Sequence, residues 1–184
     1  SIRLSESMTM TPIWPVWLDD IWAKSPVDSE GSGETLARHT WHVLERLRDM
    51  ASLRPDLPRV AGIERLWHCL FWACWFHDFG KAAQGFQAVL HNGQGLTWNH
   101  RHEVLSLAFL DWISGGLSRD EVDWVTAAIA FHHRDPKEIN RRYPRPYSSN
   151  SWDDQLSGLC CVAKDTLEGL WRWIDVCAGS WIEE

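Results

Sequence analysis

Phe76-His77-Asp78-Phe79-Gly80-Lys81 is a stretch in which an imidazole and a carboxylate adjoin at the end of a very apolar run. That run, Leu66 to Phe76, is apolar almost all the way round and is typical of a buried central helix. Burying a charge is costly unless the charge is paired or bound to a metal. His77 and Asp78 are therefore either a hydrogen-bonded pair inside the core or part of a metal site.

The composition is typical of one globular domain. The chain has 184 residues, of which 45% are hydrophobic and 23% are charged. We expect residues 1–12 to be a leader or a cloning remnant, and residues 13–184 to form a single domain, complete or truncated at its C-terminus. No apolar run is long enough to span a membrane, so we expect no membrane partner. The five cysteines form no C-x-x-C pair and are interpreted as reduced, buried thiols, which predicts a cytoplasmic protein. A net charge of −7 does not itself predict a nucleic acid partner, which would need a local basic patch or a metal.

Apolar residues recur at helical spacing along most of the chain, and no segment shows the alternation of a strand. We therefore predict an all-α fold of five to seven helices. Thr35 or Ser32 is expected to cap the first helix, Ser118 and Glu121 have the spacing of a capping box, and Gly80 is expected to stop the second helix. The predicted helices cover residues 35–50, 62–79, 83–90, 99–113, 118–133 and 153–181.

Histidines lie on or beside the apolar faces of four of these predicted helices. His39 lies on the first helix, His77 at the end of the second, His102 at the start of another, and His132-His133 at the end of a further one. A single histidine of this kind is usually a core residue, satisfied by a backbone carbonyl. Several of them on different helices, together with Asp78, favour a divalent first-row metal. Since a carboxylate can bridge two ions, the pattern predicts a site for one or two metal ions.

The motifs that carry these histidines also occur in a recognisable order between residues 22 and 133. That order resembles the HD phosphohydrolase superfamily, and specifically its CRISPR-associated Cas3 nuclease branch. The motifs are Trp22-Ala23-Lys24-Ser25-Pro26, Gly33-Glu34-Thr35-Leu36 with His39, His77-Asp78-Phe79-Gly80-Lys81 with Phe86-Gln87, Arg101-His102-Glu103 with Ser106, and His132-His133.

The resemblance implies a compact helical HD fold with a two-metal site. It assigns one divalent transition metal ion to His39, His77 and Asp78, and a second to Asp78, His102, His132 and His133. Asp78 would bridge the ions, which could be Mn²⁺, Ni²⁺, Co²⁺ or Fe²⁺, and Asp78 and Lys81 would be catalytic, with Lys81 near the scissile phosphate. The family usually has one more aspartate ligand in a late helix, which here would be Asp165, Asp175 or a residue beyond position 184.

A cluster of basic residues directly follows the paired histidines. Tyr143 and Tyr147 lie among these residues, and positive side chains beside aromatic ones suit a single nucleic acid strand. A solvated loop would have a similar composition. The candidate nucleic-acid-binding residues are Arg134, Lys137, Arg141, Arg142 and Arg145.

The function that the resemblance implies is metal-dependent hydrolysis of single-stranded DNA in CRISPR interference. The expected partners are a Cas3 helicase domain or subunit and a Cascade-type complex; the residues contain no Walker motif of their own. One alternative is an HD-type phosphohydrolase of small nucleotides, which would need a closed pocket. Another is a catalytically incomplete docking module, which would lack part of the metal shell.

Overall fold

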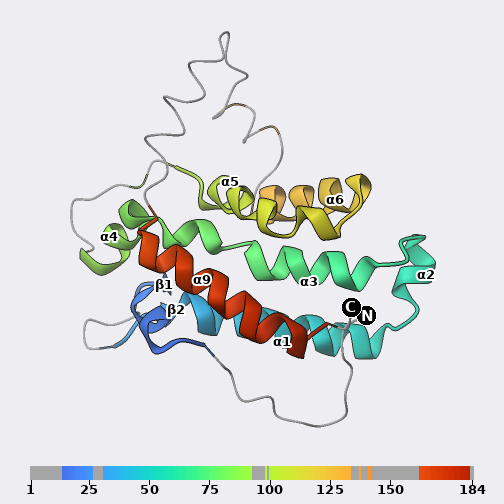
Figure 1. Cartoon of the computed structure of the whole chain (residues 1–184), viewed down its shortest axis with the longest axis horizontal. Coiled ribbons are helices and arrows are strands. Elements are labelled where there is room, and N and C mark those ends of the chain that lie inside the picture. The colour runs from blue at the N-terminus through green and yellow to red at the C-terminus, as the bar shows by residue number, and fades with distance from the viewer. Residues whose placement is uncertain are drawn as a thin grey trace.

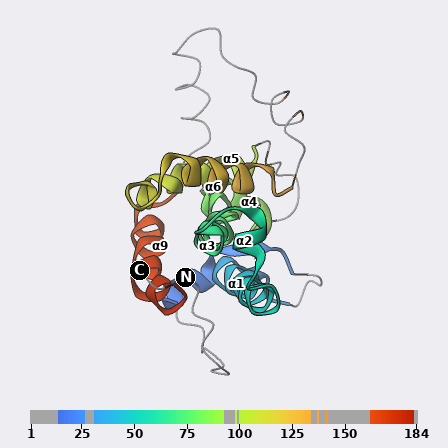
Figure 2. The same ribbon diagram turned by 90° about the vertical axis from the view of Figure 1, so that its right-hand side faces the viewer.

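Helix α3 (Leu66–Phe76) lies at the centre of the molecule, as its apolar sequence predicts. This computed structural model describes residues 14–26, 31–92, 98, 100–133, 137, 141 and 162–182. Helices α1 (Leu36–Leu53) and α6 (Arg119–Phe131) lie on opposite sides of α3 (Figures 1 and 2). The predicted all-α fold class is confirmed, with one small exception near the N-terminus.

Shorter elements surround these three helices. The remaining described α-helices are α2 (Leu57–Ala61), α4 (Gln84–Asn92), α5 (His102–Ser106) and α9 (Lys164–Cys177). The 3-10 helices are η1 (Val16–Asp20), η2 (Phe79–Ala82), η3 (Leu107–Trp112), η4 (Ser114–Gly116) and η5 (Ala178–Ser180). Within these described ranges, no helix has both the length and the apolar character needed to cross a bilayer.

Tryptophan side chains join the helices in the core, which accounts for part of the unusual total of 14 in the chain. Trp75 of α3 and Trp173 of α9 are both fully buried, and their ring centroids are 4.7 Å apart. Trp41 of α1 meets Trp181 edge-on at 5.0 Å. Complete burial of a large apolar side chain contributes about 1.5–3 kcal/mol. This core holds the C-terminal end of α3, where the His-Asp pair lies.

A two-stranded antiparallel sheet is the exception to the all-helical prediction. Strand β1 (Trp22–Lys24) pairs with β2 (Glu34–Thr35), and Lys24 lies opposite Glu34. Strands of three and two residues are too short for an alternating pattern to be recognised in the sequence. The pairing fixes Glu34 just before α1, and the Thr35 side chain caps that helix by accepting a hydrogen bond from the backbone N–H of Arg38 at 3.1 Å.

The predicted helix over residues 62–79 is wrong at both ends. Gly62 has a left-handed φ of 69° and ends α2, so that α3 begins only at residue 66. At the other end α3 stops at Phe76, and the chain turns at His77 and Asp78 before continuing as η2. Apolar residues occur on both sides of this turn, which is why periodicity alone merges the segments.

Gly80 is therefore not the helix stop that the sequence predicts. The described glycine with positive φ is Gly62, whereas Gly80 lies within η2. A Cβ atom on Gly80 would lie 2.0 Å from the backbone oxygen of His102 and 2.8 Å from the backbone nitrogen of Ser106. The absence of a side chain is needed here because α5 approaches η2 closely.

The other boundaries differ less. The predicted helix over 99–113 is divided into α5 and η3. The tract predicted over 153–181 forms α9 and η5 where it is described, and its residues 153–161 lie outside the described residues. The predicted capping box is confirmed: Ser118 accepts from the N–H of Glu121 at 3.3 Å, and Glu121 accepts from the N–H of Ser118 at 2.7 Å.

Candidate metal centre

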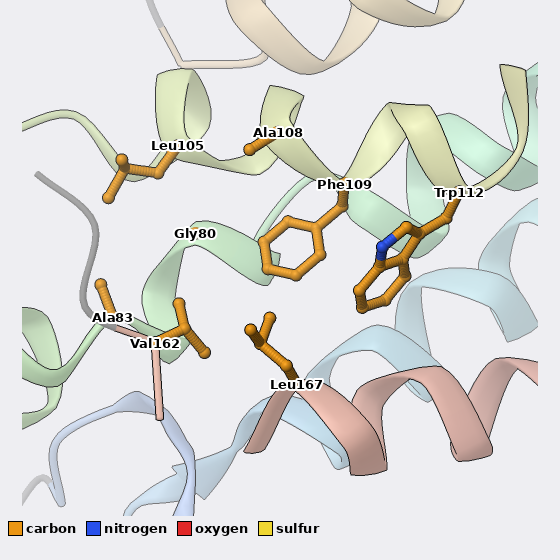
Figure 3. Close-up of a pocket in the computed structure, with 8 residues that line it drawn as sticks. All are labelled: Gly80, Ala83, Leu105, Ala108, Phe109, Trp112, Val162 and Leu167. Atoms are coloured by element: carbon orange, nitrogen blue, oxygen red, sulfur yellow. The ribbon is translucent and has the colours of Figure 1, made fainter. Parts of the chain in front are cut away.

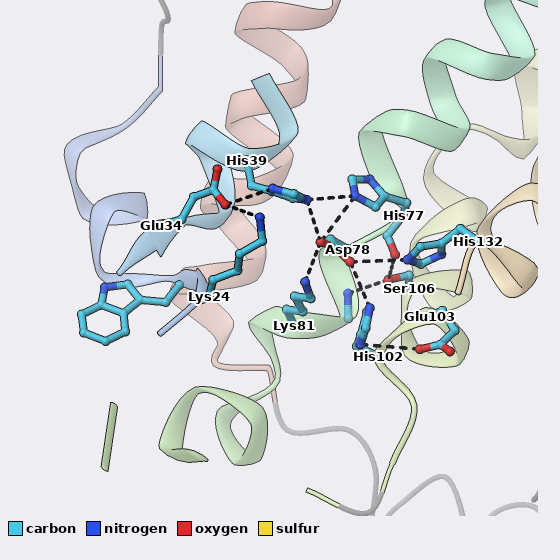
Figure 4. Close-up of polar contacts among 12 residues, drawn as sticks. Lys24, Glu34, His39, His77, Asp78, Lys81, His102, Glu103, Ser106 and His132 are labelled. Atoms are coloured by element: carbon cyan, nitrogen blue, oxygen red, sulfur yellow. Dashed lines mark hydrogen bonds and ion pairs between the residues drawn. The ribbon is translucent and has the colours of Figure 1, made fainter. Parts of the chain in front are cut away.

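Imidazoles from four elements meet around one buried carboxylate, that of Asp78. The Asp78 side chain is 1% exposed and lies in the turn between α3 and η2. His39 approaches from α1, His77 from the end of α3, His102 from the start of α5 and His132 from the end of α6 (Figure 4). Residues that are up to 93 positions apart in the sequence thus share one site.

The two oxygens of Asp78 face different histidines. Oδ2 lies 3.2 Å from His39 Nε2 and 3.4 Å from His77 Nε2. Oδ1 lies 3.0 Å from His102 Nε2 and 3.6 Å from His132 Nε2. All six residues assigned to metal binding in the sequence therefore lie together, in two groups. Within each group, the ligand atoms all lie within 4.8 Å of one another. The first group is His39, His77 and Asp78, and the second group is Asp78, His102, His132 and His133.

Backbone carbonyls anchor one histidine in each group. His77 Nδ1 lies 2.7 Å from the backbone oxygen of Cys74, and His132 Nδ1 lies 2.7 Å from that of Ile129. A carbonyl oxygen can only accept a hydrogen bond, so each Nδ1 must carry the hydrogen. In the neutral form of each ring the Nε2 atom then has its lone pair toward Asp78, and in the protonated form Nε2 donates to Asp78.

Carboxylates face the Nδ1 atom of two further histidines, His39 and His102. His39 Nδ1 lies 3.3 Å from Glu34 Oε2, and His102 Nδ1 lies 3.5 Å from Glu103 Oε2. Sequence reasoning missed the contribution of both glutamates, although each belongs to one of the quoted motifs. The signal in the sequence was a carboxylate close to a ligand histidine, but the sequence does not reveal which ring nitrogen it reaches.

The polar atoms at the centre fit a bound cation. Asp78 Oδ1, His102 Nε2 and His132 Nε2 are buried and make no hydrogen bond, although they lie close together. Buried polar atoms are nearly always partnered, so this cluster of acceptor atoms requires an explanation. Imidazole nitrogen and carboxylate oxygen are ligands that suit divalent first-row metals, and a cation among them would satisfy all three atoms.

The protonation states also suit metal binding. Burial alone would raise the pKa of Asp78, but the surrounding imidazoles, first those of His102 and His132, hold it well below its usual range. Burial lowers the pKa of His102 and outweighs the opposing effect of Asp78. Burial, with the neighbouring His132 and His102, lowers the pKa of His133 to about 4. At neutral pH Asp78 is therefore ionised and His102 and His133 are neutral, which are their ligand forms.

Lys81 occupies the side of the centre nearest the first group. It is buried, and its Nζ donates to Asp78 Oδ2 at 2.7 Å. The backbone oxygen of Lys81 accepts from Gln87 Nε2 at 2.7 Å, and the same amide group of Gln87 hydrogen-bonds the backbone N–H and C=O of Trp22. Gln87 thereby ties the turn that carries Lys81 to strand β1.

Ser106 fixes the turn from the opposite side. Its hydroxyl accepts from the backbone N–H of Gly80 at 2.8 Å and donates to the backbone oxygen of His77 at 3.0 Å. One buried hydroxyl of α5 thus holds both ends of the turn that contains Asp78, which explains its place in the motif Arg101-His102-Glu103 with Ser106.

Some of the predicted site residues do not join the centre. Asp165 and Asp175 are exposed on α9 and belong to neither group, so neither completes the first metal shell in the described part of the chain. Of the candidate DNA-binding residues, Lys137 and Arg141 are exposed. The others, Arg134, Arg142 and Arg145, lie outside the described residues.

An apolar cavity of about 240 Å³ lies beside η2 (Figure 3). The side chains of Phe109, Trp112 and Leu167 converge on it. The described residues that line it include no histidine and no carboxylate, and none of them offers a side chain that could bind a phosphate or a metal. The lining residues are Gly80, Ala83, Leu105, Ala108, Phe109, Trp112, Val162 and Leu167.

Comparison with known proteins places these features in a family context. The family model described as "Cas3, HD domain" matches residues 22–183. The curated protein named CRISPR-associated nuclease/helicase Cas3 subtype I-F/YPEST, from Pseudomonas aeruginosa (strain UCBPP-PA14), is 46% identical over 54 residues. That alignment covers 29% of this chain and 5% of the relative, so the chain matches only a small part of the relative's length. No solved structure matches the chain significantly.

Proposed function

This chain belongs to the Cas3 HD domain family, and from that premise we propose that it cleaves single-stranded DNA by metal-dependent phosphodiester hydrolysis at the Asp78 centre. The family is a CRISPR-associated, HD-type nuclease domain of the metal-dependent hydrolase kind. The observation that carries the proposal is the single buried carboxylate faced by the Nε2 atoms of four imidazoles. Two acceptor-rich groups that share Asp78 are an arrangement for two divalent ions.

The residues of the chain divide the chemistry among them. His39, His77 and Asp78 would hold one ion, and Asp78, His102, His132 and His133 the other. A bound ion of this kind lowers the pKa of water from about 15.7 toward about 7 and so supplies hydroxide at neutral pH. Lys81 provides a positive charge at the edge of the centre, where it would neutralise charge on the phosphoryl oxygens. Ion identity, among Mn²⁺, Ni²⁺, Co²⁺ and Fe²⁺, is part of the proposal to be tested.

One observation favours this function over a docking module. A docking module would have an incomplete metal shell. Here three ligand residues lie in the first group and four in the second, without Asp165 or Asp175.

The proposed partners are based on the name of the relative and on the chemistry of a nucleic acid strand. The relative's name joins a nuclease with a helicase. We propose that a Cas3 helicase domain or subunit delivers the strand in the cytoplasm after recruitment by a Cascade-type complex. The exposed Lys137 and Arg141, with the basic residues around them in the sequence, would contact the phosphates of the strand.

The test is a cleavage assay with the purified chain. The protein is stripped with a chelator, resupplied with Mn²⁺, Ni²⁺ or Co²⁺, and given end-labelled single-stranded DNA, the matching duplex, or a small phosphodiester. We expect single-strand cleavage that requires metal and is lost in Asp78→Asn but kept in His91→Ala, which changes an exposed histidine outside both groups.

The other results would each overturn the proposal in a different way. Hydrolysis of the small ester without DNA cleavage would indicate a small-molecule phosphohydrolase. Metal binding without hydrolysis of any substrate would indicate a docking module. Cleavage that persists in Asp78→Asn would show that the nuclease activity does not come from this centre.

A further inference from the structure

The two groups around Asp78 share part of their plan. Each contains one histidine whose Nδ1 faces a backbone carbonyl and one whose Nδ1 faces a carboxylate, and the second group also contains His133. We propose that Glu34 and Glu103 are positioning residues that separately set the affinity of the two groups for divalent ions, Glu34 through His39 and Glu103 through His102. The inference rests on the proposed function in that it requires both groups to bind metal.

Glu34 is held in place by the strand pairing that precedes α1. Its Oε2 lies 3.3 Å from His39 Nδ1 and 2.7 Å from the Nζ of Lys24. Lys24 is the residue opposite Glu34 in the sheet. Its Oε1 lies 3.5 Å from the Nδ1 of the exposed His42. The side chain is 24% exposed, so it can be changed without opening the core.

Glu103 reaches the second group from inside the protein. Its side chain is 0% exposed, and a buried carboxylate requires partners of opposite charge or hydrogen-bond donors. Arg101 forms an ion pair with it, and His102 Nδ1 lies 3.5 Å from Oε2, a contact longer than a hydrogen bond. A carboxylate that orients a metal ligand is one reason for a protein to bury such a group. Figure 4 shows the Glu103 carboxylate beside the His102 ring, on the side away from Asp78.

The physical effect of each glutamate is to fix the tautomer of one ring. A carboxylate beside Nδ1 favours the tautomer that carries its hydrogen there, so the Nε2 lone pair points at Asp78 and becomes more basic. Loss of such an outer partner typically lowers metal affinity by about 10–100-fold. Because His39 faces Oδ2 and His102 faces Oδ1 of Asp78, the two effects should fall on different ions.

Calorimetric titration of the chelator-stripped chain with Mn²⁺ tests this separation. We expect the wild-type chain to bind two ions, and Glu34→Gln and Glu103→Gln each to weaken one of them by about 10–100-fold. The affected group is identified in two backgrounds. In His132→Ala, where the first group remains intact, Glu34→Gln should weaken the remaining ion. In His77→Ala, where the first group is damaged, Glu103→Gln should weaken the ion that the second group binds.

Lys24→Met is the matched control for Glu34. It removes the ion pair that Glu34 forms in the sheet but leaves the contact with His39, so the affinity should stay at the wild-type value. Melting temperatures without metal show whether each variant is folded. If Glu103→Gln does not fold because it loses the ion pair with Arg101, the titrations of Glu34→Gln alone test the inference.

Three results would overturn the inference. These are unchanged affinity in Glu34→Gln, an equal loss at both ions in that variant, or the same loss in Lys24→Met. Failure of the wild-type chain to bind any ion would overturn the proposed metal centre as well. Two ions bound by the wild type, with no effect of Glu34→Gln, would overturn this inference and leave the proposed function standing.

Discussion

The carboxylate of Asp78 offers one oxygen to His39 and His77 and the other to His102 and His132. A substitution here therefore removes a ligand from both groups, whereas a substitution of His102 removes one from the second group only. We predict that Asp78→Asn abolishes binding of both ions and that His102→Ala abolishes one, with nuclease activity falling further in Asp78→Asn. Metal content after dialysis and cleavage rates measure the difference; equal, mild losses would contradict it.

Folding must be controlled in that comparison. Asp78→Asn leaves the buried ammonium of Lys81 without its anionic partner, and breaking a buried pair costs about 3–5 kcal/mol. The double variant Asp78→Asn/Lys81→Met removes the unpaired charge. It should recover thermal stability while metal binding stays lost, because the recovered packing does not restore the carboxylate.

Gly80 allows a second prediction at the residue scale. A Cβ atom at this position would lie 2.0 Å from the backbone oxygen of His102, so Gly80→Ala must push α5 away from η2. We expect a loss of about 1–3 kcal/mol of stability, as for other overpacked sites, and weaker metal binding because His102 moves. Gly115→Ala is the control: nothing lies within 4 Å of its Cβ, and chemical denaturation should show a much smaller change.

The ligand residues could be predicted from the sequence because their types and order form a motif. The contributions of Glu34 and Glu103 could not, because they depend on which ring nitrogen faces the carboxylate. The need for Gly80 was predicted for the wrong reason. A sequence shows that a glycine occurs near a helix end, but only the distance to His102 shows that space, and not a left-handed φ, requires it.

At the scale of elements, local capping patterns predicted helix starts correctly, but an apolar pattern that continues across a turn hid the boundary between two helices. The capping box at Ser118 is a local pattern and was predicted correctly. The break between α3 and η2 was missed because Phe76 and Phe79 continue the apolar pattern across the turn. That turn is the feature that directs Asp78 into the centre, so the part of the fold that matters most for the site is the part that periodicity hides.

The capping box gives a prediction for helix α6. Ser118→Ala should cost about 1 kcal/mol because the N–H of Glu121 loses its acceptor. The hydrogen bond from the Ser118 backbone is the main cause that lowers the pKa of Glu121 below its ordinary 4.5. A lowered pKa means that the stabilisation is present above pH 4.5 and is lost as the pH falls through the lower folded value.

Urea denaturation at several pH values measures this effect. The stability of Glu121→Gln should fall less steeply below pH 4.5 than that of the wild type, because the group no longer titrates. Arg119→Ala changes the neighbouring exposed position and should keep the wild-type slope. A slope that is the same in Glu121→Gln and the wild type would contradict the prediction.

At the scale of the whole molecule, the centre joins α1, the turn after α3, α5 and the end of α6. A ligand that binds only the folded state stabilises it, by about 2.7 kcal/mol at a hundredfold excess over Kd. We predict that chelation lowers the melting temperature by several degrees and that Mn²⁺ restores it. Asp78→Asn/Lys81→Met should melt at one temperature with or without chelator. A chelator effect that persists in this variant would place the stabilising ion elsewhere.

The fold class and the set of elements that meet could be predicted, since four histidine-bearing helices in one domain leave few arrangements. The sheet that places Glu34 could not, because its two strands contain three and two residues. The packing of α5 against η2 could not either, because it depends on long-range contacts between Gly80, Ser106 and His77 that no local pattern encodes.

The position of Lys81 makes the two groups unequal. Its ammonium lies 2.7 Å from Oδ2, the oxygen that the first group uses, whereas Oδ1 makes no hydrogen bond. A cation that approaches Oδ2 meets this positive charge at closer range than a cation that approaches Oδ1. For a centre that binds two ions as we propose, we therefore expect the His102 side to bind its ion more tightly than the His39 side.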